Sequence, residues 1–319
     1  MALSRRNALK IGLGTGAALL LDRFPVLARQ EASLIRRIIP TSGQAVPVIG
    51  LGSWRTFDVD PGGPDAAGPR EVLRLFHELG GEVVDTAPSY GESEAFVGNV
   101  AQDLGIQARL FLATKVNVQG EGSGAALEQM ERSSEVLGKE VLDLMQVWNL
   151  GDRNFQNLSD RYLDEHMAAL AEWKERGRVR HIGITTSFPQ QYEDVEAALL
   201  RYPLDFVQLD YSIGDRVPEE RLLPLAEDRG VAVMVNQPFT SGRLFSAVQG
   251  EALPEWASEF DATSWAQFFL KYIVSHPAVT AAIPATSDPE HLVDNMGACV
   301  GELPDQAMRR RMVEYFDGL

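Results

Sequence analysis

Most of this chain alternates short apolar runs with longer amphipathic stretches, beginning near residue 48. The short runs have the length and the composition of buried strands. Strands are predicted at Val48–Gly52, Glu82–Thr86, Leu110–Val116, Leu142–Trp148, His181–Thr185, Phe206–Tyr211, Val231–Gln237 and Ala281–Pro284.

The longer stretches repeat apolar residues at helical spacing, and one follows each strand. Helices are predicted at Arg70–Leu79, Glu94–Leu104, Ala125–Leu137, Tyr162–Arg176, Gln191–Arg201, Glu219–Arg229 and Ser264–Ser275, with an eighth around Pro289–Cys299. Eight strand–helix pairs in 319 residues favour an α/β fold of the (β/α)8 type, a TIM barrel. A doubly wound open sheet is the alternative, but no G-x-G-x-x-G turn follows any early strand.

The segment ahead of the first barrel strand, from Ile35 to Gly50, has two short apolar parts on either side of a Ser-Gly turn. This pattern predicts a β-hairpin that caps the barrel, so the domain is expected over residues 35–319. Two long polar segments, Phe57–Gly68 and Asn149–Asp160, each follow a strand. Both are expected to hang over the carboxyl end of the barrel as substrate loops.

The first 28 residues have a different character. Ser4-Arg5-Arg6 and Leu9-Lys10 precede an apolar run from Ile11 to Leu21, and Val26-Leu27-Ala28 offers a small-residue cleavage site. This order predicts a signal peptide of the twin-arginine type, hence a partner in the export machinery and a periplasmic or otherwise extracytoplasmic location. The run is too short to span a bilayer, which needs about 20 apolar residues. An uncleaved amphipathic anchor is the alternative.

Charge and composition exclude several classes of function. The net charge of −16 would become about −19 after cleavage, because the leader carries four cations and one anion. Such a charge disfavours nucleic acid and anionic lipid as partners. A single cysteine, Cys299, excludes an intrachain disulfide, and the five histidines show no metal-ligand spacing, so no metal site is predicted.

Three side chains that suit acid–base chemistry are expected at the carboxyl ends of neighbouring strands, where barrel enzymes hold their active sites. Asp85 ends one strand, Tyr90 follows in the same loop, and Lys115 ends the next strand. A buried lysine needs a partner, which Asp85 can supply. Lys115 beside Tyr90 is expected to lower the phenol's pKa from its usual value of about 10, which would tune a proton donor. The alternative is that Asp85 and Lys115 form only a structural ion pair at the ends of their strands, in which case Tyr90 would be a loop residue without a role.

The run from Asp85 to Glu94, Asp-Thr-Ala-Pro-Ser-Tyr-Gly-Glu-Ser-Glu, resembles the active-site motif of the aldo-keto reductases, and Ala113-Thr114-Lys115 resembles their lysine strand. The resemblance implies reduction of an aldehyde or ketone by NADP- or NAD-linked hydride transfer. In that scheme Tyr90 is the general acid, Lys115 tunes its pKa and Asp85 orients Lys115.

Trp148 departs from the family pattern, which places a histidine there. An indole N–H can donate one hydrogen bond but cannot accept or carry a proton. We therefore expect Trp148 to fill the histidine's space, to narrow the pocket and to leave proton transfer to Tyr90 and Lys115. Because the histidine is absent, the alternative is a barrel that binds the cofactor but has weak or abolished reductase activity.

The resemblance also implies a set of cofactor-binding residues around the same mouth. They are Gly52, Ser53, Asp85, Thr185, Thr186, Gln208, Asn236, Gln237, Phe239, Ser241, Thr286, Ser287, His291 and Asn295. Thr186 and Gln208 would hold the nicotinamide carboxamide, or alternatively form a structural network with backbone groups. Asn236 stands where the family commonly has a tyrosine that stacks on the nicotinamide. The family favours NADPH, but Ala285 and His291 replace the lysine and arginine often found near its 2′-phosphate.

A third function, carbohydrate processing, would need two carboxylates across the mouth, for which Asp210 and Asp152 are candidates. That scheme gives no role to Lys115 beside Tyr90.

Overall fold

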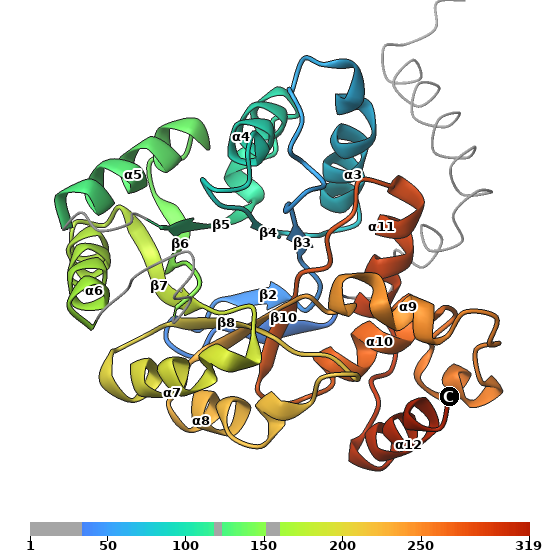
Figure 1. Ribbon diagram of the computed structural model, residues 1–319. Coiled ribbons are helices and arrows are strands. Elements are labelled where there is room, and N and C mark those ends of the chain that lie inside the picture. Colours follow the sequence, from blue (N-terminus) through green and yellow to red (C-terminus); the bar gives the residue numbers. More distant parts are fainter. Residues whose placement is uncertain (1–33, 118–122, 151–159) are drawn as a thin grey trace, which may run out of the picture.

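The structure, a computed structural model, describes residues 34–117, 123–150 and 160–319. In this part of the chain eight parallel strands follow one another in sequence order and curve into a barrel (Figure 1). The strands are β3 (Leu51–Gly52), β4 (Val83–Asp85), β5 (Phe111–Val116), β6 (Leu142–Val147), β7 (Val179–Thr185), β8 (Phe206–Asp210), β9 (Ala232–Asn236) and β10 (Val279–Ala282). Bridges from Ile49 to Ala282 and from Gly52 to Ala285 join the first strand to the last. The predicted (β/α)8 barrel is confirmed.

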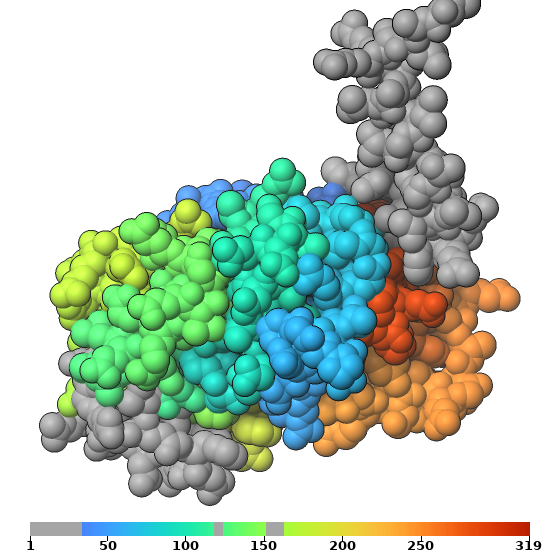
Figure 2. All heavy atoms as spheres, turned by 90° about the horizontal axis from the view of Figure 1, so that it is seen from above, coloured from blue at the N-terminus to red at the C-terminus, as the bar shows by residue number. Residues whose placement is uncertain are grey.

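A helix follows each strand and packs on the outside of the barrel. These helices are α3 (Ala67–Glu78), α4 (Ser93–Asp103), α5 (Ser123–Val136), α6 (Asp160–Glu175), α7 (Tyr192–Arg201), α8 (Leu222–Asp228), α10 (Trp265–Val274) and α11 (Pro289–Met296). Figure 2 shows α3, α4 and α5 side by side along one flank. The eight helices match the predicted segments, although α8 and α11 are shorter because 3₁₀ turns precede the first and follow the second.

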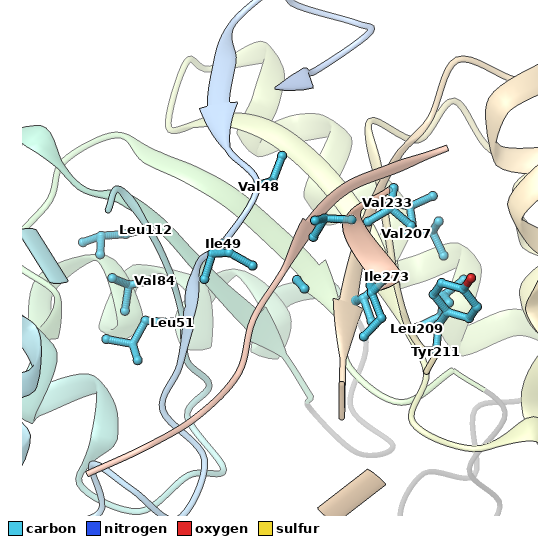
Figure 3. Packing of buried hydrophobic residues seen from close by; sticks show 14 of the residues in the cluster. Val48, Ile49, Leu51, Val84, Leu112, Val207, Leu209, Tyr211, Val233 and Ile273 are labelled. Carbon is cyan, nitrogen blue, oxygen red and sulfur yellow. The ribbon is translucent and has the colours of Figure 1, made fainter. Parts of the chain in front are cut away.

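Apolar side chains pack on both faces of the strands, as alternation along a strand requires. The outward residues, such as Val84, Leu112 and Val207, pack against the helices (Figure 3). The inward residues, such as Phe111 and Phe206, form a separate cluster inside the barrel. Buried on both sides, the sheet needs near-continuous apolar strands, which explains why the short runs could be recognised.

The predicted hairpin is present as β1 (Arg36–Ile38) and β2 (Ala45–Pro47), paired antiparallel. Ile39 and Val46 belong to the interior cluster, and Arg36 forms an ion pair with Glu82, immediately ahead of β4. The hairpin therefore closes the amino end of the barrel. Consequently, only the carboxyl end can serve as a mouth.

Two further helices, α9 (Arg243–Ala247) and α12 (Gln306–Asp317), are absent from the predicted set. Arg309 of α12 donates to Glu219 Oε1 at 2.7 Å, and Tyr272 of α10 donates to the same oxygen at 2.7 Å. Tyr211, which follows β8, donates to that oxygen as well. One carboxylate thus fastens the C-terminal helix to the barrel (Figure 1).

The predicted signal peptide, residues 1–28, lies outside the described residues, as do Asp152 and most of the loop 149–160. In the part of the chain that is described, no helix has the length and hydropathy to cross a membrane.

Candidate active site

Asp85 and Lys115 meet inside the mouth of the barrel. Both point inward, because Val83 and Ala113, two residues earlier on their strands, belong to the interior cluster. Lys115 Nζ donates to Asp85 Oδ2 at 2.6 Å and to Thr86 O at 2.9 Å. The two side chains are only 1% and 4% exposed. Removing either charge would leave the other one buried without compensation.

The second oxygen of Asp85 connects two more strands. Gln208 of β8 donates its Nε2 to Asp85 Oδ1 at 2.8 Å, and Gln146 of β6 does so at 3.4 Å. Gln146 was not among the predicted site residues. It could have been found, because it is a glutamine in an apolar strand and lies two residues before Trp148, on the same face.

The turn that carries Tyr90 is held by the loop after β3. Gly91 has φ of +60°, and a Cβ there would lie 2.0 Å from Asp58 Oδ1, so the position requires glycine. The same Asp58 oxygen accepts a hydrogen bond from Glu92 N at 2.9 Å. Asp58 therefore fixes the position of the turn next to Tyr90, a contact that sequence reasoning missed.

Lys115 and Trp148 both lie next to Tyr90. The ammonium of Lys115 is placed over the tyrosine ring, with Nζ 4.9 Å from the ring centre, and both residues influence the pKa of the phenol. Trp148 follows β6 directly, and its backbone N–H bonds to Val116 O at 3.0 Å. The structure thus brings Asp85, Tyr90, Lys115 and Trp148 together.

The predicted lowering of the phenol's pKa is wrong in its net direction. Burial raises the pKa of Tyr90 above its usual value, and the nearby Lys115 and Trp148 only partly oppose that rise. For Lys115, burial is the largest single effect and lowers the pKa, but Asp85 and Tyr90 together outweigh it and the net pKa is raised. At neutral pH the pair is therefore a protonated phenol beside an ammonium, which is the form that a proton donor needs.

The residues expected around the nicotinamide carboxamide bond to one another. Asn236 Nδ2 donates to Thr186 O at 2.8 Å and to Gln208 Oε1 at 3.4 Å. Thr185 Oγ1 accepts from Asn149 N at 2.8 Å. With Gln208 bonded to Asp85 at its other end, this arrangement matches the structural-network alternative for Thr186 and Gln208.

The segment after β9 has an unusual backbone. Gln237, Thr240 and Ser241 all have positive φ, between 47° and 54°, and Gly242 continues the series at 86°. Such conformations are unfavourable for residues other than glycine, and they occur most often at functional sites. Backbone N–H groups in turns of this kind can form a concave anion site. Phe239 lies in the same segment, partly exposed and tilted against Phe245 at 4.8 Å between ring centres.

The predicted anion site ahead of α11 is partly filled by the chain's own groups. Thr286 Oγ1 accepts from Asp288 N at 3.0 Å, and Asp288 Oδ1 caps the helix by accepting from Glu290 N at 2.8 Å. Ser287 is exposed beside these two acidic side chains, which disfavours a phosphate there.

Two more predicted residues lie on α11 itself. His291 is exposed near the start of the helix, and Asn295 is buried one turn later. Both are compatible with contact to a cofactor that lies along the rim of the barrel.

Gly52 and Ser53 lie where the barrel closes. A Cβ on Gly52 would lie 2.9 Å from Ile283 O, so the glycine permits the close approach of β3 to β10. Ser53 is fully buried, and its Oγ has no hydrogen-bond partner among the described residues. The next residue, Trp54, is 47% exposed, with the Arg55 guanidinium 4.3 Å above its ring.

The described residues suit a dinucleotide at this mouth. Asn236 Oδ1 and Asp210 Oδ1, on neighbouring strands, are buried acceptors with no partner within the described ranges. A carboxamide or ribose hydroxyl would satisfy them, and the positive-φ segment 240–242 offers backbone N–H groups to phosphate. Asp210 also belonged to the carbohydrate alternative, whose second carboxylate, Asp152, is not among the described residues.

Comparison with known proteins places the chain among reductases. The model of the aldo/keto reductase family matches residues 48–311. Methylglyoxal reductase YeaE of Escherichia coli is 28% identical over 279 residues, which are 84% of this chain and 91% of that protein. An NADH-specific methylglyoxal reductase of the same organism is 28% identical over 233 residues, 65% of this chain and 68% of that protein.

Solved structures agree with this assignment. An aldo/keto reductase of Klebsiella pneumoniae in complex with NADP and acetate has a TM-score of 0.70 at 26% identity, covering 86% of this chain and 93% of that one. A structure from the same organism in complex with NADPH has a TM-score of 0.72 at 25% identity, covering 89% and 96%. The matched family model, which spans the barrel and all four of the residues Asp85, Tyr90, Lys115 and Trp148, shows that this chain belongs to the aldo/keto reductase family.

Proposed function

We propose that this protein reduces an aldehyde or ketone to the corresponding alcohol, with NADPH or NADH as the hydride donor. The carrying observation is the contact of a protonated phenol, Tyr90, with a buried Lys115–Asp85 ion pair at the mouth of the barrel. Family membership and the NADP-bound neighbours of similar structure support the same reaction.

When bound, the reduced nicotinamide supplies a hydride to the carbonyl carbon, and the protein supplies binding and charge. Tyr90 gives its hydroxyl proton to the carbonyl oxygen and becomes a phenolate. Lys115 stabilises that phenolate, because its ammonium lies over the tyrosine ring, 4.9 Å from the ring centre. Asp85 keeps the ammonium charged and fixed in place. Solvent then returns a proton to Tyr90.

The cofactor would lie across the mouth between three groups of residues. Phe239 and Ser241 belong to the segment that would hold the pyrophosphate, Asn236 would accept a hydrogen bond from the nicotinamide side, and Asn295 would lie near the adenine. One of the relatives is an NADH-specific enzyme, so either NADP or NAD is consistent with the family. Measured KM values for NADPH and NADH would decide between them.

The test is consumption of reduced cofactor in the presence of 4-nitrobenzaldehyde, with Tyr90→Phe as the matched variant. We expect turnover by the wild type and its loss in the variant, while cofactor binding, followed by fluorescence, persists. Cofactor binding without turnover on a broad panel of carbonyl compounds would instead support the alternative, a barrel that has lost reduction.

We also propose that residues 1–28 form a cleaved twin-arginine signal, that residues 35–319 form the exported barrel, and that the mature enzyme works outside the cytoplasm. The Ser4-Arg5-Arg6 motif, the apolar run and the small-residue site support this. Replacing Arg5 and Arg6 together by lysine should retain the protein in the cytoplasm, as judged by cell fractionation. Equal export of both forms would refute the proposal.

A further inference from the structure

Three consecutive residues fasten the turn that carries Tyr90 to its surroundings. The backbone N–H of Glu92 is held by the loop after β3, and Ser93 Oγ donates to Ser53 O at 3.3 Å, at the end of that strand. The third residue is Glu94, which lies in the first turn of α4 and is 7% exposed. Its carboxyl group has no role in the chemistry described above.

Glu94 connects α4 to the strand that carries Lys115. Its Oε1 accepts the hydroxyl of Thr114 on β5 at 2.5 Å, and its Oε2 accepts the hydroxyl of Ser133 on α5 at 3.3 Å. Thr114 immediately precedes Lys115. Because neighbours in a strand point to opposite faces, Thr114 faces the helices and Lys115 faces the interior of the barrel. A bond that fixes Thr114 from outside therefore also fixes the backbone from which Lys115 projects.

A carboxyl group at this position is unfavourable for stability. Both hydrogen bonds that Glu94 accepts within the described ranges come from neutral hydroxyl groups. Burial raises the pKa of Glu94, and the two hydroxyls together with Lys115 only partly oppose that rise. Burying an acid with neutral partners costs free energy. In return, the two oxygens accept from two elements at once and so tie α4 to both β5 and α5.

We propose that Glu94 is a positioning residue for proton transfer, and that its bond to Thr114 holds the Tyr90 turn in register with Lys115. The inference rests on the proposed reductase function and adds to it a residue on the outer side of the sheet. The path from the phenol to the ammonium along this route is covalent except at that one hydrogen bond. If the bond is lost, the turn and the strand can shift apart, and a misplacement of about 1 Å between reacting groups can cost about 100-fold in rate.

The chain offers a matched pair of variants for the test. Thr114→Val removes the hydroxyl that binds Glu94 to the lysine strand, and Ser133→Ala removes the one that binds it to α5. Both side chains are buried, so each variant leaves one oxygen of Glu94 without its partner and should lose stability, which urea unfolding measures. We expect kcat for 4-nitrobenzaldehyde to fall about 10–100-fold in Thr114→Val and to stay near the wild-type value in Ser133→Ala. The KM for reduced cofactor should be unchanged in both.

Two substitutions of Glu94 itself show which property of the side chain matters. Glu94→Gln keeps an oxygen that can accept from Thr114 and should retain most of kcat, whereas Glu94→Ala should lose about as much as Thr114→Val. Because both positions act through one bond, the double variant Glu94→Ala/Thr114→Val should be no slower than the slower single variant. If Thr114→Val does not fold, comparison of Glu94→Ala with Ser133→Ala makes the same distinction.

Equal kcat in Thr114→Val and Ser133→Ala would overturn the inference, because a residue that only stabilised the fold would affect both variants alike. A loss in Glu94→Gln as large as in Glu94→Ala would overturn it as well, as would losses that multiply in the double variant. If the wild type binds the reduced cofactor but does not reduce 4-nitrobenzaldehyde, the reductase function itself fails, and the inference fails with it. Turnover by the wild type therefore distinguishes the two failures.

Discussion

Asp210 should destabilise the folded protein whenever its carboxyl group is ionised. It is 7% exposed at the end of β8, and its Oδ1 has no hydrogen-bond partner among the described residues. Burial, with a contribution from the nearby Asp215, raises the pKa of Asp210 from 3.8 to about 6. Each pKa unit corresponds to 1.36 kcal/mol, so the ionised form costs about 3 kcal/mol above pH 6.

The sign follows from proton binding. The folded state holds the Asp210 proton more tightly than the unfolded state, so the destabilising contribution of Asp210 is absent below about pH 4, grows as the pH rises to about 6 and is complete above that. Asp210→Asn has no charge to bury. It should therefore be about 3 kcal/mol more stable than the wild type at pH 8, and nearly equal to it at pH 4.

Urea unfolding at pH 4, 5, 6, 7 and 8, followed by circular dichroism, measures this difference directly. Asp65→Asn, at an exposed position, is the matched control and should change stability by less than about 0.5 kcal/mol at any pH. Lower stability of Asp210→Asn at pH 8 would refute the reasoning, as would a difference from the wild type that does not depend on pH. Such results would mean that the carboxylate is better solvated than its burial implies.

Three other outcomes are expected from the active site. Lys115→Met should abolish reduction and lower the free energy of unfolding by about 3–5 kcal/mol, because Asp85 remains buried and unpaired. The aldehyde assay measures the first effect and equilibrium unfolding the second. Unchanged stability would contradict the prediction. Gly91→Ala should destabilise by about 1–3 kcal/mol through backbone strain and contact with Asp58, and Asp58→Ala should recover part of the loss in a double-mutant cycle; additive effects would argue against that contact. Because burial raises the pKa of Tyr90 above its usual value, wild-type reductase activity should persist at neutral pH and fall only at strongly alkaline pH, as a pH–rate profile would show.

The barrel and its central ion pair could be predicted because both depend on local patterns. Strands buried on both faces are nearly continuous apolar runs, so a polar residue at their end, such as Asp85 or Lys115, is conspicuous. The C-terminal helix could not be found in this way. Its attachment depends on Arg309 meeting Glu219, 90 residues earlier, and helical periodicity does not record contacts between distant parts of a chain.

The chemistry of Tyr90 shows a similar limit. Lys115 was predicted from the sequence to lie beside Tyr90. The net direction of the shift in the pKa of Tyr90 was not predicted, because the burial of the phenol depends on every element around it. A strand pattern predicts which face a side chain is on, but how deeply a group at the end of a strand is buried is set by the loops and neighbours beyond it.

The hairpin β1–β2 closes the amino end of the barrel and leaves its carboxyl end open. The chain enters the barrel at the closed end, where Ile35 N–H bonds to Cys299 O at 2.7 Å, while the catalytic groups lie at the opposite pole. The export signal that we propose for residues 1–28 would therefore join the barrel at the end opposite the catalytic groups. If the protein is exported as proposed, a receptor bound to that signal would leave the mouth uncovered, and a nucleotide bound inside the cell could stay in place.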